Sequence, residues 1–171
     1  MSIIETISKK VALVGHHAVG KTSLISRFVQ GKFPEKYLTT IGLKVDKKSI
    51  VVHQTQIDLI IWDIAGQEEV TRIPHYYLNG CHGFFYVMDL SRPTTYKDVA
   101  SHMTMLRGIV PKAEAVLVGN KKDLIKPDEL TGVIESCQIK PEVVTSAKAG
   151  EGVEEMFAML AQKMISAHVP S

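Results

Sequence analysis

The chain has 171 residues, of which 45% are hydrophobic and 22% are charged, as is typical of one globular domain with a single core. Its formal net charge is only +2 and it contains no dense block of Lys or Arg, which argues against a nucleic-acid surface. Cys81 and Cys137 lie far apart without metal-ligand spacing, so we expect free thiols in a reducing compartment.

No targeting segment or direct lipid anchor is evident in the sequence. The N-terminal MSIIETISKK has no apolar signal region and no Gly at position 2, and the C-terminal ISAHVPS has no cysteine for prenylation. No apolar run approaches membrane-spanning length. We therefore expect residues 1–171 to form a single cytoplasmic domain.

Short apolar runs alternate with longer amphipathic stretches along the chain. The runs at 11–14, 59–62, 84–88, 115–118 and 143–144 are almost entirely apolar, which predicts strands buried on both faces of a parallel sheet. The mixed segment 45–52 joins the strand at 57–62 through HQTQ, which predicts a hairpin with an antiparallel edge strand. The last helix, expected at 153–166, has an apolar stripe whose methionines fill the core. The pattern predicts an open α/β sheet with ligands at the carboxyl ends of its strands.

The first strand is followed by a glycine-rich loop and then by the helical segment SLISRFV. The loop runs Gly15-His16-His17-Ala18-Val19-Gly20-Lys21-Thr22. A glycine, four residues and Gly-Lys-Thr between a strand and a helix predict a phosphate-binding loop, in which backbone N–H groups and the helix N-terminus bind phosphate oxygens. Lys21 would neutralise the β and γ oxygens, and the Thr22 hydroxyl would coordinate Mg²⁺. An ordinary glycine turn is the alternative, which this context disfavours.

Two further strands end in polar motifs. Asp63, followed by Ala65-Gly66-Gln67, ends the strand at 59–62, where a carboxylate can hold Mg²⁺ directly or through water. Gly66 offers an N–H to a γ-phosphate, and the Gln67 amide can orient water. These residue types are common in loops, so the motif is persuasive only together with the phosphate-binding loop.

The motif after the strand at 115–118 is Asn120-Lys121-Lys122-Asp123. The Asp123 carboxylate is suited to accept hydrogen bonds from the guanine N1–H and amine, a donor pair that adenine lacks. Asn120 can brace neighbouring loops, and the stem of Lys121 can cover one face of the base. Ser146-Ala147-Lys148, after the strand at 143–144, would complete the pocket with the Ala147 N–H on the guanine oxygen. A solvated charged turn is the alternative interpretation.

Taken in this order from about residue 9 to 165, the four motifs resemble those of the Ras superfamily of small GTPases. The resemblance implies a six-stranded, mostly parallel sheet with one antiparallel edge strand, flanked by five helices. It also implies a guanine-nucleotide switch, in which GTP and Mg²⁺ order two loops and slow hydrolysis releases them. These are switch I, which begins at Lys36 and ends at Gly42, and switch II, which begins at Asp63 and ends at Tyr76. Effectors, exchange factors and GTPase-activating proteins would bind through them.

The resemblance assigns roles residue by residue. Thr40 matches the switch I threonine that binds Mg²⁺ and the γ-phosphate, Tyr37 the tyrosine that closes over the phosphates, and Phe33 the aromatic at the guanine edge. The expected catalytic residues are Gln67, Lys21, Thr40 and Gly66, and the expected metal ligands are Thr22, Thr40 and Asp63. The expected nucleotide-binding residues are Gly15, His17, Ala18, Val19, Gly20, Lys21, Thr22, Ser23, Phe33, Tyr37, Thr40, Gly66, Asn120, Lys121, Asp123, Ser146, Ala147 and Lys148.

Within the superfamily the sequence is most similar to the Rab branch, through TTIGLKV, LIIWDIAGQEE and HYYLNGCHGFFYVMDL. It departs from that branch at Val45, where Rab proteins usually have phenylalanine, at Glu69, where they usually have arginine, and in lacking their C-terminal cysteines. His16 and His17 are also unusual. We expect the His16 imidazole to point to solvent, whereas His17 matches a glycine beside the γ-phosphate, where a side chain can crowd the switch II glutamine.

Three functions compete at this stage. The first is a slow GTPase switch, and the second is a GTP-locked binding module whose hydrolysis is blocked by His17. The third is a P-loop kinase, which would share only residues 15–22 and would not need the guanine motif at Asn120 to Asp123. We favour the first.

Overall fold

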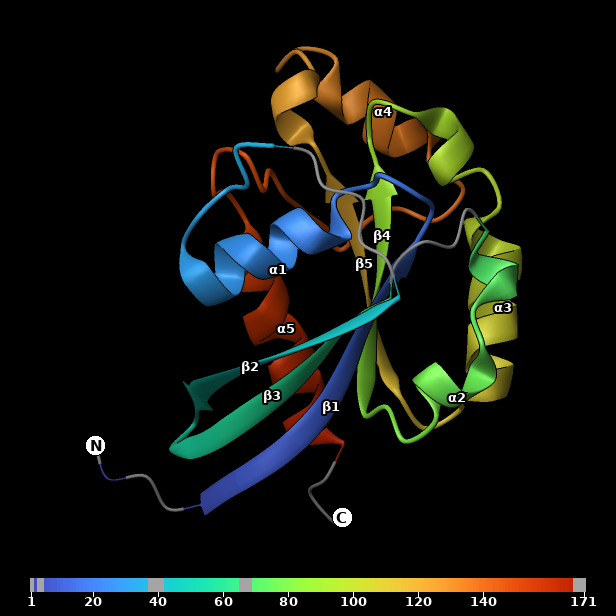
Figure 1. Cartoon of the computed structure of the whole chain (residues 1–171). Helices are drawn as coiled ribbons and strands as arrows, with labels where there is room; N and C mark the ends of the chain where they lie inside the picture. The colour runs from blue at the N-terminus through green and yellow to red at the C-terminus, as the bar shows by residue number, and fades with distance from the viewer. Residues whose placement is uncertain (1, 3–4, 37–41, 65–68, 168–171) are drawn as a thin grey trace.

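The structure, a computed structural model, describes residues 2, 5–36, 42–64 and 69–167. Its centre is a six-stranded sheet in the order β2-β3-β1-β4-β5-β6 (Figure 1). The strands are β1 (Glu5–Gly15), β2 (Leu43–Val52), β3 (Thr55–Ile64), β4 (Gly83–Asp89), β5 (Glu114–Asn120) and β6 (Val143–Val144). Among these six strands, only the β2–β3 pair is antiparallel. The predicted sheet, with its antiparallel edge strand, is confirmed.

Five α-helices are present in the described ranges, as the family resemblance implies. They are α1 (Lys21–Gln30), α2 (His75–Leu78), α3 (Val99–Ile109), α4 (Leu130–Ser136) and α5 (Val153–Ser166). Three short 3-10 turns accompany them: η1 (Val70–Arg72), η2 (Pro93–Thr95) and η3 (Lys122–Leu124). None of the helices in these ranges has the length and apolarity needed to span a bilayer.

The β2–β3 hairpin turns through two residues. His53 and Gln54 both have positive φ angles, 47° and 67°, the backbone of the mirror-image turns that match the twist of paired strands. Thr55 already pairs with Val52. The expected connection HQTQ is therefore too long, because Thr55 and Gln56 belong to β3.

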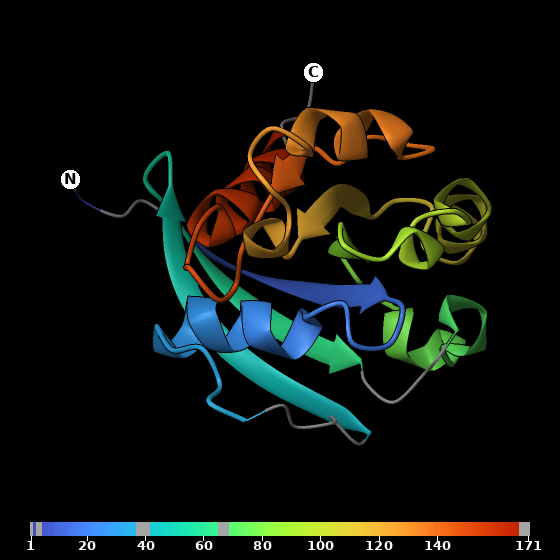
Figure 2. The same ribbon diagram turned by 90° about the horizontal axis from the view of Figure 1, so that it is seen from above.

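The sheet is covered on both faces, which explains its continuously apolar strands. In β1, Val11 and Leu13 contact one core and Ala12 and Val14 the other, because successive strand residues point to opposite faces. Helices α1 and α5 cover the first face and α2 and α3 the second (Figure 2). Met156 and Met164 of α5 are buried in the first core, which confirms their predicted packing role.

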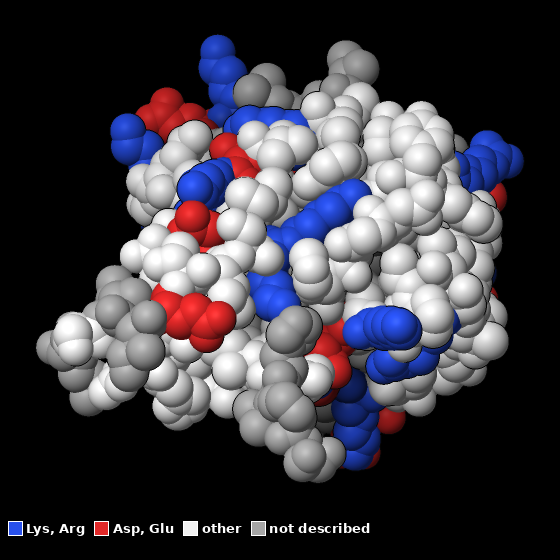
Figure 3. Space-filling view, turned by 90° about the horizontal axis from the view of Figure 1, so that it is seen from below, with Lys and Arg blue, Asp and Glu red and all other residues white. Residues whose placement is uncertain are grey.

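Every parallel strand ends at the same edge of the sheet, the upper edge in Figure 1. The loops that follow β1, β5 and β6 therefore meet there, beside Asp63 near the end of β3, and these segments carry predicted motifs. At the opposite end of the molecule, Lys and Arg are interspersed with Asp and Glu (Figure 3), in keeping with the small net charge.

Candidate functional site

Two glycines fix the shape of the loop between β1 and α1. Gly15 has φ +151°, and a Cβ atom there would lie 2.3 Å from the Val87 carbonyl oxygen. Gly20 has φ +102°, and a Cβ atom there would lie 2.3 Å from Asn120 Nδ2. Neither position can accept a larger residue without moving its neighbour. The glycine spacing seen in the sequence is therefore required by the packing of the loop against Val87 and Asn120.

Lys21 spans the inside of this loop. Its Nζ atom donates to the carbonyl oxygens of Gly15 and His16, both at 3.0 Å. Burial lowers the pKa of the Lys21 ammonium to about 8, although the Asp63 carboxylate acts in the opposite direction. A phosphate in the loop would supply the negative charge that this buried cation lacks.

Thr22 and Asp63 come together as predicted for a metal site. The Thr22 hydroxyl donates to Asp63 Oδ2 at 2.7 Å. Asp63 is only 1% exposed, and its Oδ1 atom is buried with no hydrogen-bond partner among the described residues. Burial raises the pKa of this carboxyl above its ordinary value. A hydroxyl and a carboxylate oxygen that lacks a partner fit a hard cation such as Mg²⁺, which prefers oxygen ligands.

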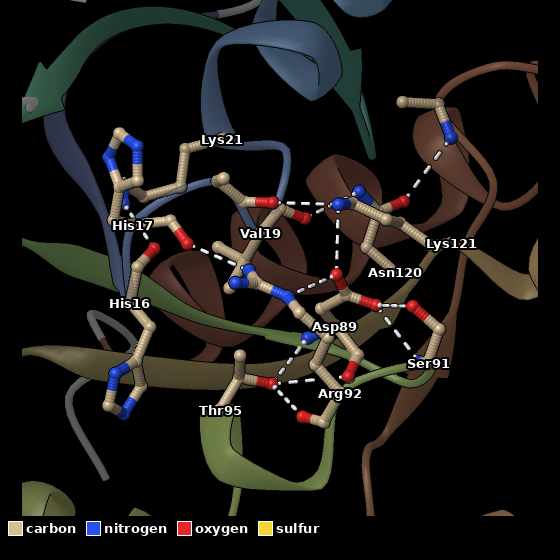
Figure 4. A network of polar contacts seen from close by, with 12 residues as sticks. His16, His17, Val19, Lys21, Asp89, Ser91, Arg92, Thr95, Asn120 and Lys121 are labelled. Carbon is tan, nitrogen blue, oxygen red and sulfur yellow. Dashed lines mark hydrogen bonds and ion pairs between the residues drawn. The ribbon is translucent and has the colours of Figure 1, made fainter. Parts of the chain in front are cut away.

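The outside of the loop is held by side chains from two other strand ends (Figure 4). Three consecutive carbonyl oxygens each accept a hydrogen bond: His17 from Arg92 Nη2 at 2.7 Å, Ala18 from Lys121 Nζ at 2.7 Å, and Val19 from Asn120 Nδ2 at 3.0 Å. In a trans peptide the C=O and the following N–H point in opposite directions. The N–H groups that follow these carbonyls therefore face the inside of the loop, where phosphate oxygens bind in loops of this kind.

Asp89, at the end of β4, positions Arg92 and Lys121, two of the side chains that donate to the loop carbonyls. It is 1% exposed and accepts hydrogen bonds from Arg92 Nε at 2.9 Å, Lys121 Nζ at 2.8 Å, and both the N–H and the hydroxyl of Ser91, at 2.9 and 2.6 Å. Burial acts to raise its pKa, but the hydrogen bonds from Lys121, Ser91 and Arg92 outweigh burial, so the pKa lies below its ordinary value.

Asp89 and Arg92 are site residues that the sequence reasoning missed. The available signal was an aspartate at the end of an apolar strand, the same placement that identified Asp63. What the sequence could not give is the contact between Arg92 and the loop, since this depends on β4 lying beside β1.

The loops expected to bind the base are joined to one another. Asn120 Oδ1 accepts hydrogen bonds from the Thr145 hydroxyl at 3.0 Å and from the Ala147 N–H at 3.2 Å. The Ser146 hydroxyl donates to Asp123 Oδ1 at 2.7 Å. The Ala147 N–H, which was expected to face the guanine oxygen, is therefore directed at Asn120, and a base would have to share it.

Arg27 of α1 holds the 146–148 loop through two hydrogen bonds. It donates to the Ala147 carbonyl at 2.9 Å through Nε and to the Lys148 carbonyl at 2.6 Å through Nη2. Ser23 lies half-buried near the start of α1, whereas Phe33, on the loop after that helix, is 38% exposed. The helix that begins at the phosphate loop thus also positions the 146–148 loop.

The two histidines of the loop point in opposite directions (Figure 4). His17 is exposed and lies on the same side as Lys21. His16 is half-buried, its Nε2 atom is buried, and its ring centroid lies 5.6 Å from that of His102 in α3. The expectation that His16 points to solvent is therefore wrong. The loop presents this side chain to α3, and its sequence neighbours give no sign of that contact.

Four predicted site residues, Tyr37, Thr40, Gly66 and Gln67, lie outside the described residues. The remaining predicted residues of the phosphate loop, the metal pair and the 120–123 and 146–148 loops all lie at the carboxyl edge of the sheet.

Comparison with known proteins agrees with this arrangement. Residues 10–166 match the profile of the Ras family. The chain is 33% identical over 154 residues to Ras-related protein Rab-4 of Dictyostelium discoideum, covering 86% of this chain and 75% of that protein. It is 33% identical over 167 residues to Ras-related protein Rab-21 of Bos taurus (94% and 74% covered), and 32% identical over 163 residues to Ras-related protein Rab-4B of Homo sapiens (92% and 76% covered).

Proposed function

The chain belongs to the Ras family of small GTPases, and from that premise we propose that it is a guanine-nucleotide switch. It binds GTP and GDP with Mg²⁺, hydrolyses GTP slowly, and changes the conformation of switch I and switch II to control effector binding. Exchange factors and GTPase-activating proteins are proposed to act at the same two segments. A cytoplasmic location is proposed with it, supported by the two free, buried cysteines.

One observation carries this proposal: the guanine motif and the phosphate loop form a single hydrogen-bonded unit. Asn120 donates to the Val19 carbonyl and Lys121 to the Ala18 carbonyl, while Asn120 also accepts from Ala147. A base held at Asp123 and phosphates held at Lys21 would then belong to one ligand. This linkage favours a guanine-nucleotide switch over a P-loop kinase, because a kinase would not need the guanine motif at Asn120 and Asp123.

The proposed roles follow from these positions. Asp123, with one oxygen fixed by Ser146, accepts from the guanine ring, and the inward N–H groups of the loop bind phosphate oxygens. Thr22 and Asp63, with Thr40, would hold Mg²⁺, which would supply neutralising charge to the phosphate oxygens. Lys21 Nζ, which donates to the Gly15 and His16 carbonyls, would donate to phosphate oxygens instead when nucleotide is bound. Gln67, with Gly66 beside it, orients the attacking water.

Slow turnover is proposed because the arginines nearest the site are engaged away from the reacting phosphate. Arg92 is paired with Asp89 and donates to a carbonyl on the outside of the loop, and Arg27 donates to the 147–148 carbonyls. Switch I contains no arginine. With no charge supplied in cis, turnover on the order of 10⁻⁴ to 10⁻³ s⁻¹ is expected, as at unassisted sites of this kind.

A second candidate, a GTP-locked binding module, is favoured by one observation: the exposed His17 ring lies on the Lys21 side of the loop (Figure 4). A side chain there can obstruct Gln67 or an incoming arginine. The third, kinase alternative has no support from the family match.

The test is to identify the nucleotide that co-purifies with the chain, and then to follow single-turnover hydrolysis of bound GTP with Mg²⁺. GDP or GTP with slow hydrolysis supports the switch, and no hydrolysis until His17→Gly restores it supports the locked module. Equal binding of ATP and GTP would overturn both. Gln67→Leu should retain nucleotide and hydrolyse it more slowly than the parent protein.

A further inference from the structure

A second polar cluster lies on the α3 side of the phosphate loop, and the proposed function does not use it. It consists of His16 in the loop, His102 in α3 and Tyr86 in β4. The two imidazole centroids are 5.6 Å apart, and the Tyr86 hydroxyl is hydrogen-bonded to His102 Nδ1 at 2.7 Å. Tyr86 is fully buried and His102 is 8% exposed. The cluster is thus an internal contact between the loop and a helix.

Tyr86 fixes the orientation of His102. Burial raises the pKa of the Tyr86 hydroxyl well above its ordinary value, with the Asp98 carboxylate adding to the effect, so the phenol stays protonated. A phenol on a central strand has no freedom to follow a moving partner. The hydrogen bond to this buried phenol therefore fixes the His102 ring that His16 meets on α3.

His16 is connected to both functional contacts of the loop. Its carbonyl accepts from Lys21 Nζ at 3.0 Å, and the next carbonyl, that of His17, is held by Arg92. Movement of the His16 side chain would move the peptide that Lys21 binds. On the other side, α3 faces η1, which lies within the predicted switch II. Val70 of η1 and Met103 of α3 share the same core.

The cluster favours uncharged rings. His16 Nε2 is buried and has no hydrogen-bond partner among the described residues, so an added proton there would have no acceptor. Burial lowers the pKa of both imidazoles, and His102 lowers that of His16 further.

Charged groups on four neighbouring segments also face the pair. Asp98 at the start of α3 favours the protonated form of both rings, and Glu69 before η1 favours that of His102. Arg92 after β4 and Lys21 in α1 disfavour protonation of His16. Burial of both rings, together with the proximity of His16 to His102 and to these cations, thus keeps the pair neutral near pH 7, and acid would separate the rings.

We propose that His16 is a positioning residue: by packing its neutral ring against His102 it fixes the phosphate loop on α3, and protonation of this pair loosens the loop and accelerates nucleotide release. The nucleotide part of this inference rests on the proposed function. The contact between the two rings does not.

The first experiment follows the two imidazoles by proton NMR as the pH is lowered from 8 to 5, without added nucleotide. Both rings should titrate below an ordinary histidine, and His102→Ala should move the His16 titration to higher pH. Unchanged titration of His16 in that variant would overturn the pairing, whatever ligand the protein binds.

The second experiment measures dissociation of a fluorescent GDP analogue between pH 5.5 and 8. Release from the parent protein should accelerate as the pH falls below the range in which an ordinary histidine titrates. His16→Ala and His102→Ala should each release GDP about fivefold faster at pH 7.5, and the double variant should be no faster than either, because one contact is lost in all three. His16→Phe keeps a ring that cannot be protonated, so the acceleration of release in acid should be clearly smaller than in the parent protein.

His53→Asn, which removes an exposed histidine in the β2–β3 turn, is the matched control and should behave as the parent protein. Effects of His16→Ala and His102→Ala that multiply in the double variant, or a His16→Phe variant whose release accelerates in acid as much as that of the parent protein, would refute the proposal. Absence of any guanine-nucleotide binding by the parent protein would instead refute the proposed function, and the NMR titration would still decide the pairing.

Discussion

Replacing Asp89 with asparagine should lower the free energy of unfolding by more than the small change in side-chain size suggests. The buried carboxylate accepts two hydrogen bonds from Ser91 and one each from Arg92 and Lys121. Asparagine keeps the shape but removes the charge, and one of its two terminal atoms becomes a donor that faces donors. A hydrogen bond to a charged group contributes about 1.5–3 kcal/mol, against about 0.5–1.5 for a neutral pair. Weakening the contacts with both Arg92 and Lys121 in this way should therefore lower the free energy of unfolding by about 2–3 kcal/mol.

This loss should be visible in both stability and binding. In a domain of this size, about 1 kcal/mol lowers Tm by roughly 2–4 °C, so Asp89→Asn should melt about 4–12 °C lower. Because Lys121 and Arg92 hold the Ala18 and His17 carbonyls, the variant should also release nucleotide about tenfold faster, a change of about 1.4 kcal/mol. Thermal unfolding by circular dichroism and dissociation of a fluorescent GDP analogue measure the two effects.

Asp58→Asn is the matched control. It removes a carboxylate that accepts from Ser49 at 2.6 Å and pairs with Lys47 at 2.9 Å, on the β2–β3 hairpin. It should leave the rate of nucleotide release unchanged. If Asp89→Asn melts and releases nucleotide like the parent protein, the network around Asp89 does not position the loop and the reasoning is wrong.

Three further predictions address the same site. Asp123→Asn should weaken GTP binding by at least about 2 kcal/mol and improve binding of xanthine nucleotides, since the amide turns a donor toward the guanine amine; equal GTP affinity in a competition titration would contradict this. Thr22→Asn should reduce Mg²⁺-dependent GTP affinity more than GDP affinity, and the parent protein should lose affinity in EDTA, both measurable by calorimetry. Because the pKa of Asp89 is lower in the folded than in the unfolded chain, its contribution to stability is present above about pH 4 and is lost as the pH falls further; Asp89→Asn should therefore show a shallower loss of Tm in acid.

Much of the fold could be predicted because its signals are local. Strands buried on both faces are continuously apolar, and the mixed edge strand is not, so burial leaves a direct trace in the composition of each segment. Gly15 and Gly20 could be recognised for a similar reason, since left-handed backbone and close packing exclude other residues at those positions. The order of motifs after strands then placed Lys21, Thr22, Asp63, Asn120 and Asp123 at one edge of the sheet.

What only the tertiary structure decided are contacts between segments that are distant in the chain. Arg92 reaches the His17 carbonyl across 75 residues, and Arg27 reaches the Ala147 carbonyl across 120. His16 meets His102 for the same reason, because β1 lies between β3 and β4 and so presents the phosphate loop to the helix that follows β4. A local pattern records whether a side chain is buried, but its partner depends on strand order and helix packing, which are set by the chain as a whole. The phosphate-binding side of the loop could therefore be predicted from the sequence, whereas the side chains that hold the loop in shape could not.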